Sequence, residues 1–410
     1  MKKYYLITPG PTPVPPEVSA QEGLPILHHR TSEFGAIFSE VLEHLKYVFQ
    51  TRNDILLLTS SGTGAMESAV ANLLSPGDTA LVASTGWFGE RWGKILETHG
   101  VQVVWIREDE GRALVPAKIE DALKKNTAVK AVFATHTETS SGVVNDIRQL
   151  AAIVSATPAV LVVDAISGLG GQELQTDAWK VDVVVAGSQK GLMTAPGLAM
   201  VSVSPKAWPL VEASRSPRFY FDYRKIRKSI ADQETPFTPA VTLVVAMAEA
   251  LRQFKKEGLE NVLARHAWLA QATREGARAL GLTIFADPPC NVLTSLRVPQ
   301  GVDGKKLIQR LREEYGVSIA GGQGDLAGKI IRLAHMGYMD RFDVLVGLSA
   351  LEMMLQDMGA AIELGKGVAA AERVLITPPK PVSLLLEKEK VADRHYGVGG
   401  PPKTQWRKAG

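Results

Sequence analysis

The chain has 410 residues, of which 45% are hydrophobic and 22% are charged, and its formal net charge is +3. This length is typical of a large domain joined to a smaller one, and the small net charge gives no reason to expect nucleic acid or a membrane as a partner. Cys290 is the single cysteine, which excludes an intramolecular disulfide and a metal site built from several cysteines. No metal is expected.

The N-terminal residues 1–16 contain five prolines between positions 9 and 16. Proline fixes its own φ and favours extended backbone in the residue before it, so we predict an extended arm here. The same prolines would interrupt a signal peptide, and no apolar run approaches the length of a membrane span. We therefore expect a cytoplasmic protein. Residues 33–50 follow with the apolar spacing of a helix.

Short apolar runs then alternate with longer segments of mixed polarity. The runs predict strands at residues 55–58, 79–83, 103–106, 131–135, 159–163, 183–186 and 199–203. Strands that are apolar on both faces and alternate with helices indicate an α/β fold, with a mainly parallel sheet covered by helices. Ligands bind beyond the carboxyl ends of the strands in such sheets, so the loops after these strands are expected to hold the functional residues.

Two long helical patterns, at residues 240–257 and 259–280, end one predicted domain and begin the next. A smaller α/β domain follows, with predicted strands at 291–298 and 330–334 and predicted helices at 304–315 and 341–358. We accordingly divide the chain into an arm (1–16), a large domain (17–258), a small C-terminal domain (259–365) and a tail (366–410). The tail is interpreted as mobile because it is proline-rich and lacks periodicity.

Two charged residues follow neighbouring apolar strands. Asp164 comes directly after residues 159–163, where a carboxylate is costly unless it is paired. Taken alone, Asp164 fits a helix cap or a salt-bridged core carboxylate about as well as a functional group. Lys190 lies in the polar turn at residues 187–191, where a lysine is usually solvated. Alternatively, Lys190 forms a Schiff base, and its separation from Asp164 suits opposite sides of one cofactor.

Three further loops are rich in glycine and hydroxyl groups. Residues 59–67 lead into a helix, and free N–H groups together with the helix dipole predict an anion site there. No lysine follows the second glycine, so this is not a Walker A loop. Residues 84–92 carry two adjacent aromatic rings, which either lie against a flat cofactor or close over the core. Residues 136–142 form a third polar loop.

The segments SSGTGAME, GWFGERW, THTETSSG, VVDAISGLGG and GSQKG occur in this order and together resemble the class V aminotransferases, which are fold-type I enzymes of pyridoxal 5′-phosphate (PLP). The similarity is strongest to the alanine–glyoxylate and serine–glyoxylate (serine–pyruvate) aminotransferases, in particular to the cyanobacterial branch named as a soluble hydrogenase subunit. The resemblance covers about residues 4–360. It implies a large PLP-binding domain, a smaller C-terminal domain and a homodimer.

The resemblance also implies roles for individual residues. Lys190 matches the lysine that binds PLP covalently and moves the substrate proton, and Asp164 matches the partner of the pyridine nitrogen. Arg332 matches the arginine that binds the substrate carboxylate, for which a planar guanidinium with two parallel hydrogen bonds is suited. The remaining implied cofactor contacts are Ser61, Gly62, Thr63 and Gln189 at the phosphate, Phe88 and Ile166 on the two ring faces, Thr139 beside the ring, and Thr238 from the other subunit.

The implied reaction is transamination between a small L-amino acid, serine or alanine, and a small 2-oxo acid, glyoxylate or pyruvate, by a ping-pong mechanism through pyridoxamine phosphate. Transaminases of 2-aminoethylphosphonate or aspartate are near alternatives. A PLP lyase of the cysteine desulfurase type needs a cysteine on the loop before Arg332, and residues 321–329 contain none. A non-catalytic subunit of a redox complex is an alternative from another class, but the chain lacks the cysteines of an iron–sulfur or nickel site.

Overall fold

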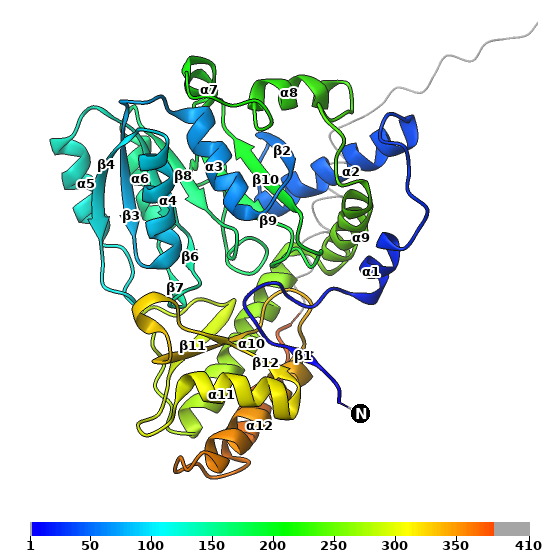
Figure 1. Ribbon diagram of the computed structural model, residues 1–410, viewed down its shortest axis with the longest axis vertical. Helices are drawn as coiled ribbons and strands as arrows, with labels where there is room; N and C mark the ends of the chain where they lie inside the picture. The colour runs from blue at the N-terminus through cyan, green and yellow to red at the C-terminus, as the bar shows by residue number, and fades with distance from the viewer. Residues whose placement is uncertain (1, 381–410) are drawn as a thin grey trace, which may run out of the picture.

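The computed structural model describes residues 2–380, and within them the main sheet has seven strands (Figure 1). These strands are β2 (Asp54–Thr59), β3 (Thr79–Ser84), β4 (Gln102–Arg107), β5 (Val129–Thr135), β8 (Val160–Asp164), β9 (Val183–Gly187) and β10 (Leu198–Val203). Their order is β2-β10-β9-β8-β5-β3-β4, and only β10 runs antiparallel to its neighbours. The predicted α/β fold with a mainly parallel sheet is confirmed, because each predicted run overlaps one of these strands.

Helices cover both faces of this sheet because alternate side chains of each strand are buried on opposite sides. Leu56 and Val82 belong to one buried layer, whereas Leu57 and Leu81 belong to the other. The helices of the first layer are α3 (Gly62–Leu73), α4 (Trp87–Thr98), α7 (Trp208–Ala213) and α8 (Tyr223–Ala231). The helices of the second layer are α2 (Ser32–Phe49), α5 (Pro116–Lys125), α6 (Ile147–Ser155) and α9 (Val241–Glu257).

A smaller unit with its own apolar core lies below the main sheet in Figure 1. Its helices are α10 (Leu259–Ala279), α11 (Gly304–Arg310), the π turn η1 (Leu311–Tyr315) and α12 (Arg341–Asp357), and its strands are β11 (Leu293–Arg297), β12 (Val317–Ser318), β13 (Ala320–Gly321) and β14 (Ile330–Ala334). Strands β11, β14 and β13 form an antiparallel sheet in that order. The shorter elements β6 (Thr137–Glu138), β7 (Val143–Val144) and η2 (Gly324–Leu326) lie in loops.

The N-terminal arm joins the two units. Its strand β1 (Tyr5–Leu6) pairs in parallel with β12, and Ile7 is buried in the core of the smaller unit. The arm then continues to α1 (Pro16–Glu22), whose Val18 packs against α9. The arm therefore crosses from the smaller unit to the main sheet, and this path takes it past the turn that carries Lys190.

The interpretation of all residues from 366 onward as a tail is wrong for Lys366–Leu375, which form helix α13. Ala371 and Leu375 of this helix are buried in the core of the smaller unit, and the Trp268 indole N–H donates to the Val374 carbonyl at 3.0 Å. The helix forms because its apolar residues recur on one face and pack on α10. Residues 381–410 lie outside the described residues, and the predicted domain boundaries stay predictions. No described helix combines the length and apolarity needed to span a bilayer.

Candidate active site

Asp164 and Lys190 lie at the same edge of the main sheet. Strands β8 and β9 are parallel neighbours, with Asp164 opposite Val185, so the turn after β9 comes close to the end of β8. The Asp164 carboxylate is buried and accepts a hydrogen bond from the Ile166 N–H at 2.8 Å. Lys190 is partly buried, and its Nζ donates to the Pro9 carbonyl. The lysine is therefore enclosed by the N-terminal arm rather than solvated.

Burial shifts both groups toward neutrality. It raises the pKa of Asp164 to about 7, although the Ile166 N–H and the charge of Lys190 act in the opposite direction. It lowers the pKa of Lys190 to about 8, against the attraction of Asp164. A lysine whose pKa is close to neutral pH gives up and takes a proton readily, as a general base and acid must.

The arm requires a glycine at position 10, where it crosses Lys190. Its φ is +132°, a conformation that side chains with a Cβ rarely adopt, and an added Cβ would collide with the Nζ, Cε and Cδ atoms of Lys190. The Thr12 hydroxyl donates to the Lys190 carbonyl at 3.0 Å, which fixes the arm to the turn from the other side. The arm and the lysine turn therefore pack as one unit.

The predicted phosphate site lies at the start of α3. Ser61 is the N-cap residue and its side chain makes no capping hydrogen bond, so N–H groups of the first turn remain available to an anion. Gly62 leaves room for Ile166, since an added Cβ would lie 2.6 Å from the Ile166 Cδ1. The Gln189 Oε1 is buried and has no hydrogen-bond partner. A phosphate group would accept hydrogen bonds from the free N–H groups of this helix start, and a water or hydroxyl group beside it would donate to the Gln189 Oε1.

The predicted ring contacts surround this position from other strands. Phe88 is half-buried in the first turn of α4, after β3. Thr139 is buried in the loop after β5, and its hydroxyl accepts a hydrogen bond from Ser167 at 3.4 Å. Ile166 follows β8 and is partly buried. Side chains from four strand ends thus converge on the edge that holds Lys190, and they fit a flat aromatic ring.

Arg332 reaches this edge from β14 of the smaller unit. Its Nε donates to the Gly321 carbonyl at 2.8 Å and its Nη1 donates to the Thr139 carbonyl at 2.5 Å. The side chain is buried, and burial lowers the pKa of Arg332 to about 10, against the charge of Glu138. Within residues 2–380 no ion pair engages this guanidinium, so its charge is available to a substrate carboxylate.

Thr238 is the predicted site residue that is expected to act on a second chain. It is exposed in the segment before α9, which is anchored to β2 by a 3.0 Å hydrogen bond from the Ala240 N–H to the Thr59 hydroxyl. No hydrogen bond among the described residues joins Thr238 to Lys190 or Asp164. The predicted contact of Thr238 with the phosphate of a second chain stays a prediction.

Sequence reasoning missed two charged residues at the site. Glu138 is fully buried beside Thr139 and accepts hydrogen bonds from the start of α4. Arg91 donates to the Thr63 hydroxyl at 2.9 Å and lies over the Phe88 ring, 4.8 Å from its centroid. Both occur in the loops that the sequence had marked as polar, but only their contacts across the sheet edge distinguish them from surface charges.

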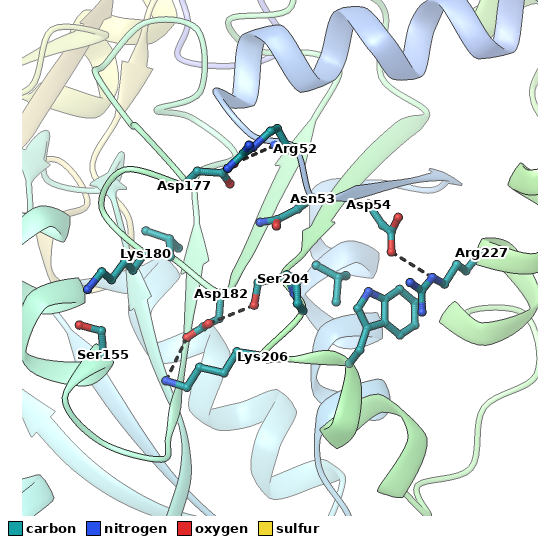
Figure 2. Close-up of a pocket in the computed structure, with 14 residues that line it drawn as sticks. Arg52, Asn53, Asp54, Ser155, Asp177, Lys180, Asp182, Ser204, Lys206 and Arg227 are labelled. Carbon is teal, nitrogen blue, oxygen red and sulfur yellow. Dashed lines mark hydrogen bonds and ion pairs between the residues drawn. The ribbon is translucent and has the colours of Figure 1, made fainter.

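A cavity of about 880 Å³ lies at the opposite edge of the main sheet (Figure 2). Its carboxylates are already neutralised, since Asp54 pairs with Arg227 at 3.0 Å and Asp182 lies 3.6 Å from Lys206. The amino ends of β2 and β9 border this cavity, whereas Asp164 and Lys190 lie at the carboxyl ends. We therefore place the active site at the Lys190 edge.

Comparison with known proteins agrees with this geometry. The family model of the class V aminotransferases matches residues 4–340. The chain is 41% identical to the "soluble hydrogenase, small subunit" of Synechococcus sp. (strain PCC 6716), over 92% of this chain and 99% of the relative. It is 37% identical to the L-aspartate–glyoxylate aminotransferase of Paracoccus denitrificans (90% and 95% covered) and 37% identical to the serine–glyoxylate aminotransferase of Methylorubrum extorquens (92% and 96% covered).

The crystal structure of the ureidoglycine–glyoxylate aminotransferase of Bacillus subtilis superimposes with a TM-score of 0.89 at 30% identity, covering 92% of this chain and 99% of that one. The site holds the lysine, the buried carboxylate, the free helix N-terminus and the buried arginine that PLP chemistry requires. The chain therefore belongs to the class V aminotransferases and is a PLP-dependent enzyme that transfers an amino group between an amino acid and a 2-oxo acid.

Proposed function

We propose that this aminotransferase takes serine or alanine as amino donor and glyoxylate or pyruvate as acceptor. The observation that carries the proposal is that the two arginines near the site, Arg332 and Arg91, have different hydrogen-bond partners. Arg332 is buried, and its guanidinium donates to the Thr139 and Gly321 carbonyls. Arg91 is hydrogen-bonded to Thr63 on the phosphate side, which leaves Arg332 to bind one α-carboxylate. This supports substrates with a single carboxylate over aspartate.

Each side chain of the site has a separate role in the reaction. Arg332 holds the α-carboxylate of the amino acid and so orients the Cα–H bond. Lys190 removes the Cα proton and later returns one, for which its lowered pKa is suited. Asp164 holds a proton at the pyridine nitrogen of the cofactor. When bound, PLP supplies the electron sink that makes the Cα proton removable. The same residues then act on the 2-oxo acid in the reverse direction.

The names of three similar proteins support glyoxylate as the acceptor, since each contains it. They differ in the donor, so aspartate remains an alternative to test alongside serine and alanine, as does 2-aminoethylphosphonate. The lyase alternative is disfavoured because Cys290 is buried and burial raises the pKa of its thiol, which makes it a poor nucleophile.

We also propose that the enzyme works as a homodimer in the cytoplasm. Thr238 is exposed beside an aromatic patch in which the Phe237 ring lies 5.6 Å from Phe219 and 5.3 Å from Tyr220, and Phe219 is 70% exposed. Exposed aromatic clusters of this kind mark protein interfaces. We infer that a second copy covers this patch and that its Thr238 then contacts the neighbouring phosphate site.

The experiment follows the visible absorption of the purified enzyme with PLP. The proposal predicts a visible band from the cofactor bound to Lys190, which serine or alanine bleaches and glyoxylate restores. The Lys190→Ala variant should lack the band, whereas Lys180→Ala, which changes a lysine at the opposite edge of the sheet, should keep it. A band that only aspartate or 2-aminoethylphosphonate bleaches would reject the proposed donors. A band that no amino acid bleaches would favour a lyase.

A further inference from the structure

Glu138 is a buried carboxylate near the site that accepts hydrogen bonds from four donors. It ends β6 and is 0% exposed. Its side chain accepts hydrogen bonds from the Gly89 N–H at 2.9 Å, the Phe88 N–H at 3.2 Å, the Ser140 N–H at 3.1 Å and the Ser140 hydroxyl at 2.6 Å. Four donors around one carboxylate compensate it for the loss of water.

These bonds replace a cap that α4 does not have in its own sequence. The N-cap residue of α4 is Gly86, which has no side chain to accept from the first turn. Glu138 accepts from two of those N–H groups, and the Trp87 N–H donates to the Ser140 hydroxyl at 3.2 Å. A Cβ at Gly86 would lie 2.6 Å from the Ser140 Oγ and 2.9 Å from the Glu138 Cγ. The glycine therefore gives the carboxylate access to the helix start.

The same carboxylate is joined to the groups that face cofactor and substrate. Phe88, whose N–H it binds, is the proposed stacking residue, and Thr139 is its neighbour in the chain. The Thr139 carbonyl accepts from Arg332 at 2.5 Å, and the Glu138 carbonyl accepts from the Gly142 N–H at 2.7 Å, which closes the loop that carries Thr139. A movement of Glu138 would therefore displace both the ring contact and the carboxylate-binding arginine.

We infer that Glu138 is a positioning residue that holds the first turn of α4, which carries Phe88, in a fixed position relative to Thr139 and Arg332. It fixes the ring-stacking surface relative to the substrate-carboxylate site. The inference rests on the proposed roles of Phe88 and Arg332. Glu138 contributes to the geometry of the site rather than to bond making.

The test compares Glu138→Gln with Glu352→Gln in the PLP-loaded enzyme. An amide presents an NH₂ group to N–H donors and so loses part of the hydrogen bonding at either position. Glu352 is a matched control because it is also buried and also accepts from a helix start, at Gly365 (2.7 Å) and Val368 (2.9 Å), but in the smaller unit away from the site. Both variants should lower the melting temperature.

Only Glu138→Gln should change the site. We expect a changed visible circular dichroism of the bound cofactor. The affinity for PLP should fall and the KM for the amino donor should rise, each by on the order of tenfold, which corresponds to the loss of one hydrogen bond to a charged group. Glu352→Gln should keep wild-type values for all three. If Glu138→Gln matches Glu352→Gln in these three readouts, the inference is wrong.

Two further results separate the possible failures. A wild-type enzyme without a visible band in the presence of PLP would contradict the proposed function and not this inference alone. If Glu138→Gln does not fold, Ser140→Ala removes the 2.6 Å donor and the acceptor of the Trp87 N–H while leaving the carboxylate. A smaller change of the same circular dichroism signal then supports the inference, and an unchanged signal overturns it.

Discussion

Replacing Gly10 by alanine should displace Lys190 from its position in the site. The φ of Gly10 is +132°, and a Cβ there would overlap the end of the Lys190 side chain. A residue with a side chain in such a conformation costs about 1–3 kcal/mol, and forcing an extra methyl group into a packed contact costs about another 1–3 kcal/mol. The second cost falls on the position of Lys190 itself.

Gly281→Ala provides the control for backbone strain. Its φ is +74° and an added Cβ would meet nothing within 4 Å, so it carries a conformational cost of about 1–2 kcal/mol without a steric one. The difference between the variants, about 1–3 kcal/mol, is roughly a fivefold to 150-fold change in an equilibrium constant. We therefore expect Gly10→Ala to weaken PLP binding by a factor in this range and Gly281→Ala to leave it unchanged.

Urea unfolding of both apoenzymes and titration with PLP, followed by visible absorption, measure the two costs separately. Equal losses of stability in the two variants, together with wild-type PLP affinity in Gly10→Ala, would contradict the expected displacement of Lys190. That result would mean that the arm moves away from Lys190 at little cost.

Three further changes test the charges and the proposed interface. Burial raises the pKa of Asp164 from 3.8 to about 7. Between these pH values the folded apoenzyme therefore binds more protons than the unfolded chain, so this carboxyl makes the apoenzyme less stable as pH rises from about 4 to 7. Asp164→Asn should flatten this part of a melting-temperature profile and still reduce turnover by orders of magnitude; a profile unchanged from wild type would be contrary to the assigned cause. Arg332→Lys should raise the amino-acid KM by roughly tenfold or more with a smaller effect on PLP affinity, since an ammonium does not reproduce a planar two-bond contact; steady-state kinetics decide, and an unaltered KM would exclude Arg332 from carboxylate binding. Thr238→Ala should weaken PLP binding without altering the molar mass measured by light scattering, whereas a monomeric wild-type enzyme would argue against the shared phosphate site.

The pattern of the sequence was sufficient for the sheet and for its functional edge. Strands such as β8 and β9 are continuous apolar runs because both faces are buried, and this property is visible locally. Asp164 was then found directly after one such run, and Lys190 in the polar turn after the next. The order of the glycine- and hydroxyl-rich segments was specific enough to identify the family.

Helix α13 shows where local reading was insufficient. Its short segment is separated from α12 by residues 358–365 and is stabilised by contacts with α10 and by the Glu352 carboxylate, which accepts from Gly365 and Val368. A helix of ten residues is marginal alone, so its existence depends on packing that the segment does not itself encode.

Tertiary structure alone decided which polar residues support the site. Glu138 and Gly89 are 49 positions apart, and Lys190 and Pro9 are 181 positions apart. A carboxylate in a hydroxyl-rich loop and a glycine in a proline-rich arm have no local pattern that sets them apart from solvated residues. Their roles arise because the parallel strands bring their loops to one edge, where burial removes water and each polar group must find its partner in the protein.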